Sequence, residues 1–371
     1  MREETTTLKR RLRELTVELA ALDGVSGHEH AVVARLVELL RPLADRIEVD
    51  SYGNLFASRR GPDGAPHLMV SAHSDEIGLL VKSIEPDGFI RLEKVGGVIE
   101  SLLIGRHVRV RGYRGVIGVK AGHLQTPEER AHVPPLRELY VDMGYDSADE
   151  VRALGIRVGD AVAYDEPVEA LANPDRLSGK ALDNRVSCAV LALLLERLAG
   201  VDLPCALTAV VTVQEEVGLR GAQMATYRLN PTAAIVVDTV PAGGTPDVDY
   251  SRDLGIRIGA GPVLALASGM GSTHGHLANP GMRDFLLRVA EEAGIPVQLA
   301  LFPRSTSDVA AVHLVRGGVP AGVVNIPRRY SHSPVETLDL NDVAATLELL
   351  EAAVRSFDGG VRLDFLASEW G

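Results

Sequence analysis

The 371-residue sequence has few aromatic residues, few cysteines, no cluster of basic residues and no long apolar run. Aromatic residues make up 4% of the chain and there is a single tryptophan, which leaves little surface for stacking against sugars. Cys188 and Cys205 lie in apolar stretches without a neighbouring cysteine or histidine. We interpret them as small buried side chains, which argues against a disulfide and against a thiolate metal site.

The charge pattern excludes several kinds of partner. A net charge of −12 without a basic cluster argues against binding to nucleic acid or to an anionic membrane. No apolar run approaches the roughly 20 residues that span a bilayer. The polar, acid-containing N-terminal segment is unlike a signal or transit peptide. We therefore expect a soluble, cytoplasmic protein.

The hydrophobic pattern changes character along the chain. Strand-like and helix-like patterns alternate in residues 1–76 and again in 168–371, which predicts an α/β fold with a mostly parallel, mixed sheet and helices on both faces. Within the first part, Ser26-Gly-His-Glu29 fits a capping box for a helix that follows it. Residues 77–167 contain short β-type runs separated by glycine, proline and charged residues, which predicts an inserted small all-β barrel. Two domains also agree with a length that exceeds what one core usually supports.

Residues that can bind metal lie where predicted strands end or a predicted helix begins. Glu215 and Glu216, for example, directly follow an entirely apolar run. An unpaired charge there costs several kcal/mol, so a neutralising partner is expected. Ligands of open α/β sheets bind beyond the carboxyl ends of the strands. We therefore expect five segments to converge on a pair of divalent cations, through His73, Asp75, Asp183, Glu215, Glu216, Asp238 and His332.

Each of these residues also has a structural explanation when it is taken alone. Asp183 and Asp238 are suited to capping a helix or a turn. The two glutamates are compatible with a solvated strand end, and His332 with a free imidazole in a polar loop. Asp75, two residues beyond His73 in an extended segment, shares its face and could hold the imidazole, as carboxylates do behind histidine ligands. The convergence of the segments, rather than any single residue, favours a metal site.

At these positions the sequence resembles a known family, the tetrahedral (TET), FrvX-like or glutamyl aminopeptidases, which are dinuclear-metal enzymes of metallopeptidase clan MH. The resemblance covers nearly the whole chain. It implies a phosphorylase/hydrolase-like zinc exopeptidase domain formed by residues 1–76 and 168–371, with a PDZ-like barrel at 77–167 that serves oligomerisation and access. The matching segments occur in the order of the family: 71–78 (SAHSDEIG), 180–185 (KALDNR), 214–222 (QEEVGLRGA), 237–238 (VD) and 327–336 (PRRYSHSPVE).

The resemblance implies how the metal ions are held. Asp183 would bridge two divalent ions, which could be zinc, cobalt or manganese. One ion would also bind His73 and Glu216, and the other Asp238 and His332. Zinc accepts nitrogen and oxygen ligands of this kind, and catalytic zinc sites keep a position open for water.

The resemblance also implies the reaction and the assembly. Glu215 would be the general base and Asp75 would orient His73. Two ions would activate a water molecule, and one would accept a free α-amine, so that the first residue of a short peptide is released. The expected assembly is a homo-oligomer in which dimers form a tetrahedral dodecamer.

One segment departs from the pattern of the family. Where many relatives read Gly-Gly-Thr-Asp-Ala, this chain has Arg304-Ser-Thr-Ser-Asp308-Val. Asp308 is retained and is expected to contact substrate, whereas the shape of the loop before it is left open. Arg304 could face an acidic substrate side chain or lie on the surface. His274-Gly-His276 could contact a ligand or belong to a polar loop.

Three other functions remain open at this point. A deacylase or a carboxypeptidase-like amidohydrolase could use the same fold, and substrates with blocked N-termini would distinguish it. A glycoside hydrolase needs only paired carboxylates, although the scarcity of aromatic residues disfavours it and histidine ligands would be superfluous. A metal-stabilised scaffold without catalysis would keep the ligands but has no need of Glu215.

Overall fold

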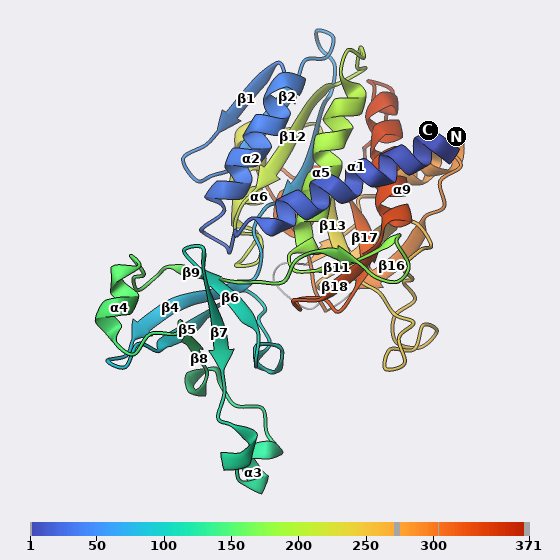
Figure 1. Ribbon diagram of the computed structural model, residues 1–371. Helices are drawn as coiled ribbons and strands as arrows, with labels where there is room; N and C mark the ends of the chain where they lie inside the picture. The colour runs from blue at the N-terminus through green and yellow to red at the C-terminus, as the bar shows by residue number, and fades with distance from the viewer. Residues whose placement is uncertain (1, 271–274, 303, 367–371) are drawn as a thin grey trace.

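The computed structural model describes residues 2–270, 275–302 and 304–366. These residues form an α/β part with a large sheet and, beside it, a small barrel (Figure 1). The predicted fold class, a mixed α/β fold with an inserted all-β barrel, is confirmed.

The large sheet has 12 strands and is parallel at its centre. The path through it runs β1-β2-β12-β3-β13-β17-β18-β11-β10. The neighbours β12, β3, β13 and β17 are parallel, whereas the flanking pairs are antiparallel. The strands are β1 (Arg46–Val49), β2 (Leu55–Arg59), β3 (His67–His73), β10 (Glu169–Ala170), β11 (Arg176–Gly179), β12 (Ala206–Thr212), β13 (Ala233–Pro241), β14 (Val263–Ser268), β15 (His276–Leu277), β16 (Gln298–Phe302), β17 (Ala321–Arg329) and β18 (Glu336–Asp339).

Helices cover both faces of this sheet because its central strands are apolar on both sides. Side chains alternate between faces along a strand. In β3, Leu68 and Val70 accordingly join the larger core, while Met69 joins the smaller one. The larger core is covered by α1 (Arg2–Ala21), α2 (His30–Leu40), α5 (Leu182–Leu198), α7 (Pro280–Glu292) and α9 (Leu340–Ser356), and the smaller one by α6 (Arg220–Leu229) and α8 (Val309–Val312).

The start of α2 differs from the prediction. Its N-cap is Glu29, and no side chain caps the helix. The predicted capping box at Ser26 is therefore wrong. The Ser26 hydroxyl instead donates a hydrogen bond of 2.6 Å to Oδ2 of Asp75. A contact across the fold has replaced the local one.

The barrel closes in the order β4-β5-β8-β7-β6-β9, and every pair in it is antiparallel. It has its own core, which includes the fully buried Ile90, Val110, Ile117 and Val141. Its strands are β4 (Gly78–Ile84), β5 (Ile90–Val95), β6 (His107–Val110), β7 (Tyr113–Gly118), β8 (Tyr140–Asp142) and β9 (Ala161–Tyr164). Full closure leaves the sheet of the barrel without an exposed edge.

Short helices complete the fold. Two lie in the barrel segment, α3 (Pro127–Arg130) and α4 (Ala148–Ala153), and α3 projects away from the rest of the molecule in Figure 1. The 3-10 helices are η1 (Arg41–Leu43), η2 (Glu100–Leu102), η3 (Gly122–Leu124) and η4 (Leu136–Glu138). Among the helices that the structure describes, none combines the length and the apolar character required to cross a membrane.

Candidate metal centre

The predicted ligands meet at the carboxyl ends of the central parallel strands. His73 is the last residue of β3, Glu215 and Glu216 follow β12, and Asp183 lies at the start of α5. Asp238 was predicted to follow its strand, but β13 continues to Pro241, so its side chain reaches the site from within the strand. The segments are thus brought together as expected, with this one change in the length of β13.

His73 is held from both sides of its ring. Its Nδ1 lies 3.3 Å from Oδ1 of Asp75. Its Nε2 lies 3.2 Å from Oδ1 of Asp183 and 3.6 Å from Oδ1 of Asp238. Below it, the Cys188 thiol of α5 donates a hydrogen bond of 3.2 Å to the His73 carbonyl oxygen. One ring nitrogen therefore faces a fixed carboxylate and the other faces two ligand oxygens.

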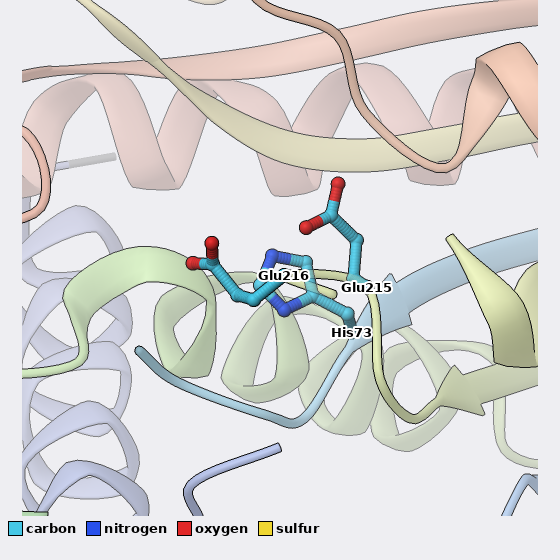
Figure 2. A group of neighbouring side chains, drawn as sticks. All are labelled: His73, Glu215 and Glu216. Carbon is cyan, nitrogen blue, oxygen red and sulfur yellow. The ribbon is translucent and has the colours of Figure 1, made fainter. Parts of the chain in front are cut away.

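Asp75 connects several parts of the site and is fully buried. Its Oδ1 accepts a hydrogen bond of 3.0 Å from the backbone N–H of Glu215. Its Oδ2 accepts bonds from Ser26 and, at 3.1 Å, from the backbone N–H of Glu216. Asp75 therefore holds the turn that carries the two glutamates, which lie on either side of the His73 imidazole in Figure 2.

The possible ligands fall into three groups among the described residues, and two of these groups share Asp183. Within one group, atoms of His73, Asp183 and Asp238 all lie within 4.8 Å of one another, and the same holds for Asp183, Glu216 and His332. His332 Nε2 is 3.4 Å from Oε2 of Glu216 and 3.6 Å from Oδ2 of Asp183. A third group joins His73 to Glu215 and Glu216.

These distances do not favour the pairing that the resemblance implied. Asp238 and His332 were expected on one ion, but among the described residues they share no such group. The reason is the place of Asp183 between them. Its Oδ1 faces His73, whose Nε2 also lies near Asp238, and its Oδ2 faces His332. Asp183 remains the only residue common to the groups that contain Asp238 and His332.

A buried arginine that was not singled out in the sequence lies against the ligands. Arg328, 3% exposed, donates to Oδ2 of Asp183 and, over 2.7 Å, to Oε1 of Glu336. Glu336 in turn accepts hydrogen bonds from the backbone N–H groups of Asp183, at 2.9 Å, and His332, at 3.0 Å. The Arg328–Glu336 pair therefore fixes the backbone of two ligands. Both residues belong to the segment 327–336, which carried the resemblance, but nothing in the local pattern indicates an ion pair.

The barrel closes the site from the other side. Gly96 and Gly97, just after β5, pass close to the ligands, and a Cβ atom at Gly97 would lie 2.5 Å from Nδ1 of His332. A Cβ atom at Gly96 would lie 3.3 Å from the Cβ atom of Glu216. Only glycine allows so close an approach of the backbone to both ligands.

The site holds more buried carboxylates than positive charges to neutralise them, and this shifts the pKa values of its residues. Burial raises the pKa of Glu215 well above its ordinary value and that of Glu216 to about 8. Burial would lower the pKa of His332, but its carboxylate neighbours, Asp183 and Glu216, raise it to about 9. Burial would likewise raise the pKa of Asp183, but Arg328 and the two imidazoles hold it well below its ordinary value. Without further cations, the carboxylates must share protons, and divalent ions remove that need.

The residues present fit two divalent cations. Oδ1 of Asp183 is buried and, although Nε2 of His73 lies 3.2 Å away, it accepts no hydrogen bond from the described residues. The converging side chains offer imidazole nitrogens and carboxylate oxygens, a set that suits zinc, cobalt and manganese. Asp183 is not a helix cap, because no side chain caps α5. Glu215 is not at a solvated strand end, because it is only 9% exposed.

Comparison with known proteins decides the family. The model of the M42 glutamyl aminopeptidases matches residues 53–349. The chain belongs to this family. Among its relatives, a putative aminopeptidase of Acetivibrio thermocellus is 34% identical over 92% of this chain and 98% of the relative. The lysyl aminopeptidase of Pyrococcus furiosus is 33% identical over 91% of this chain and 95% of the relative.

Solved structures of this family have the same fold. An aminopeptidase from the archaeon Desulfurococcus kamchatkensis matches with a TM-score of 0.89 at 37% identity, over 98% of each chain. The TET1 peptidase of Pyrococcus horikoshii, which can assemble into a tetrahedron or a large octahedral shell, has a TM-score of 0.81 at 29% identity, over 94% of this chain and 99% of its own. A protein of Thermotoga maritima named endoglucanase has a TM-score of 0.75 at 33% identity, over 92% and 96% of the two chains.

The predicted resemblance is therefore confirmed, and this M42 protein is a metal-dependent aminopeptidase. Its ligands line one end of a cavity of about 260 Å³. Ser305, Thr306 and Ser307 line the cavity, but Asp308 does not. Asp308 is 1% exposed, and its Oδ2 accepts a hydrogen bond of 2.6 Å from Thr212. The predicted contact between Asp308 and substrate is not supported by this position.

Two other predictions concern the rim of the cavity. Arg304 is exposed and does not line the cavity, so it is a surface residue. His274 lies outside the described residues. His276 is buried, its Nδ1 is 3.3 Å from the Ser268 hydroxyl, and it belongs to none of the ligand groups in the described part of the chain.

Proposed function

We propose that this M42 aminopeptidase releases the N-terminal residue of short peptides by means of two divalent cations, with Glu215 as the general base. The observation that carries this proposal is the position of Glu215. It is buried beside the ligands and belongs to neither of the two groups that share Asp183, although it forms a third group with His73 and Glu216. With the ions in the two groups that share Asp183, the carboxylate of Glu215 is left free to exchange a proton, which a bound ligand cannot do.

The proposed ligands follow the distances. Asp183 would be shared by the two ions, His73 and Asp238 would hold one of them, and Glu216 and His332 would hold the other. When bound, such ions supply the Lewis acidity that acidifies a water molecule and polarises the carbonyl of the scissile bond. Zinc, cobalt and manganese all accept this ligand set.

The side chains of this chain supply the proton transfers and the alignment. Glu215 takes the proton of the attacking water and delivers it to the leaving amine. Asp75 keeps Nε2 of His73 directed at the ligand oxygens and holds the backbone N–H of Glu215.

A peptide panel tests this function. Metal-stripped protein, reloaded with zinc, cobalt or manganese, is given each peptide with a free and with an acetylated N-terminus. We expect metal-dependent release of only the first residue, and only from free N-termini. Equal cleavage of acetylated peptides would assign the site to a deacylase.

A glycoside hydrolase is the alternative function to consider, because the similar Thermotoga maritima protein is named endoglucanase. Phe302 is the only aromatic side chain among the described residues that line the cavity. Sugars bind through stacking on such rings, so the cavity offers them little. A soluble β-glucan added to the same panel should release no reducing ends, and release that depends on Glu215 would contradict the proposal.

We also propose that the protein works as a homo-oligomer of dimers, up to a tetrahedral dodecamer, in which the barrel takes part. The TET1 peptidase, which forms such shells, matches this chain over 94% of its length. Light scattering after size-exclusion chromatography measures the mass, and a monomer at every metal concentration would contradict the assembly. A cytoplasmic location belongs to the same proposal and is supported by two cysteines that are both buried and unpaired.

A further inference from the structure

The cavity continues beyond the metal ligands along the face of the sheet. In the parallel pair of β13 and β17, Asp238 lies opposite Asn325. Residues two apart in a strand share a face, and Val240 and Val323 line the cavity together with these two residues. We call these lining residues beyond the ligands, Val240, Val323 and Asn325 together with Ser268 and Thr306, the wall of the cavity. A substrate whose scissile bond lies at the ligands has its first side chain close to this wall.

This wall carries almost no charge. Outside the ligand cluster and Glu215, Arg328 is the only ionisable side chain among the described residues that line the cavity. Its guanidinium already donates to Asp183 and Glu336. A charged substrate side chain would thus leave water without gaining a partner, which costs several kcal/mol. An apolar side chain gains about 25 cal/mol for each Å² that it buries.

The polar groups of the wall are neutral. Asn325 is 5% exposed, and its Oδ1 has no hydrogen-bond partner among the described residues. The Ser268 hydroxyl lies 3.2 Å from Oγ1 of Thr306. His276 behind it also stays uncharged at neutral pH, because burial lowers its pKa to about 4. These groups can accept a hydrogen bond from a neutral substrate group, but none of them neutralises a charge.

We propose that this wall receives the side chain of the N-terminal residue and selects uncharged residues, with Ser268 and Asn325 as the positions that determine specificity. The inference rests on the proposed function, because it needs a free N-terminus held at the ligands. It adds the class of substrate, which is peptides that begin with an apolar or a neutral polar residue.

A series of peptides with one varied position tests the inference. The first residue is Leu, Met, Gln, Lys, Arg, Glu or Asp, and the remaining sequence is constant. We expect kcat/KM for Leu and Met to exceed that for Lys, Arg, Glu and Asp by about 100-fold. If a charged residue is the best substrate, the inference is overturned while the aminopeptidase stands. If no peptide in the series is cleaved, the proposed function itself fails.

Two substitutions identify the wall as the determinant. Ser268→Asp, assayed at pH 8 so that His276 is neutral, adds a negative charge away from the ligands. We expect the ratio of kcat/KM for Lys over Glu to rise about tenfold or more. The matched control, Ser51→Asp, adds the same charge at an exposed turn and should leave the ratio unchanged.

Asn325→Asp keeps the shape of the side chain and serves where Ser268→Asp does not fold. Metal content and melting temperature are measured first, so that the ratio is compared only between folded, loaded proteins. An unchanged Lys over Glu ratio in a folded, loaded variant at either position would show that the substrate side chain lies elsewhere.

Discussion

The Ser26 hydroxyl donates a hydrogen bond of 2.6 Å to Oδ2 of Asp75, whose Oδ1 lies 3.3 Å from Nδ1 of His73. The bond links the loop before α2 to the ligands. Ser26→Ala leaves a buried carboxylate with one partner fewer, so we expect the melting temperature to fall. Since partners behind metal ligands tune affinity, we also expect metal binding to weaken by at most about tenfold. Calorimetric metal titration checks this, and the exposed Ser51→Ala should bind metal like the wild type.

Glu215 and Glu216 are adjacent, yet their substitutions should have different effects. Glu215→Gln removes the proposed base and should lower kcat by about 10²- to 10⁴-fold with metal content intact. Glu216→Gln removes a proposed ligand and should lower metal content as well. Mass spectrometric metal analysis and steady-state kinetics on the two variants separate these roles. Loss of metal from Glu215→Gln would contradict the assignment of the base.

The pairing of ligands can be tested by counting ions in double variants. If His73 and Asp238 serve one ion, His73→Ala/Asp238→Asn should retain the other. His73→Ala/Glu216→Gln should then retain neither, because each substitution disables a different site. Metal content of the dialysed, folded proteins gives the answer. One retained ion in the second variant and none in the first would restore the pairing implied by the sequence, and Asp183→Asn should bind neither ion in both schemes.

Arg328 should contribute most to the unfolding free energy when the site holds no metal. Arg328→Met leaves Asp183 and Glu336 buried without their cation, which we expect to cost about 3–5 kcal/mol of unfolding free energy in the metal-free protein. Divalent ions should restore part of this, so the gain in melting temperature on adding metal should exceed that of the wild type. The control is Arg355→Met, which breaks an exposed pair with Glu351. Equal gains in the two variants would show that Arg328 does not compensate the ligand charge.

Because His276 resists protonation in the folded protein, we expect the unfolding free energy to decrease in mild acid. Its pKa is lowered by burial to about 4, whereas the ordinary value is 6.5. Between these values the unfolded chain binds more protons than the folded one, so stability is fully present above pH 6.5 and falls towards pH 4. We expect about 2 kcal/mol less unfolding free energy at pH 5 than at pH 7 from this residue.

Urea unfolding of the metal-free protein at the two pH values measures the effect of His276. In His276→Asn the difference between pH 7 and pH 5 should shrink by that amount. The metal-free form is used because metal release in acid would otherwise add to the change. A difference as large as that of the wild type would show that His276 does not resist protonation.

The sequence predicted where the candidate ligands lie better than it predicted the contacts around them. His73, Asp183 and Glu216 lie at strand ends or at a helix start, where the hydrophobic pattern stops abruptly, and this is visible locally. Asp238 was placed after its strand because the apolar run ends there, although parallel pairing with β17 continues past it. The hydrophobic period of the sequence and the positions of its polar residues therefore located the site, but they did not predict the length of β13, which supplies Asp238.

Contacts between distant segments could not be read from the sequence. The ion pair of Arg328 and Asp183 joins residues 145 positions apart, and no spacing rule connects them. Ser26 matched a local capping pattern, but a buried carboxylate competes for its hydroxyl in the folded chain. The flanking strands β11 and β18 were not predicted, because each has four residues and gains its order from pairing with the other.

Cys188 gives the centre a reporter of its own opening. Its thiol lies beneath His73, and burial raises its pKa to about 12, while burial raises that of Cys205 to about 11. Since the thiolate is the reactive form, both sulfurs are inert towards alkylating reagents in the closed protein. An alkylating reagent should therefore reach Cys188 only when the packing between β3 and α5 opens. The rate of alkylation of Cys188 then measures how often this opening occurs in the natural chain, without an attached dye.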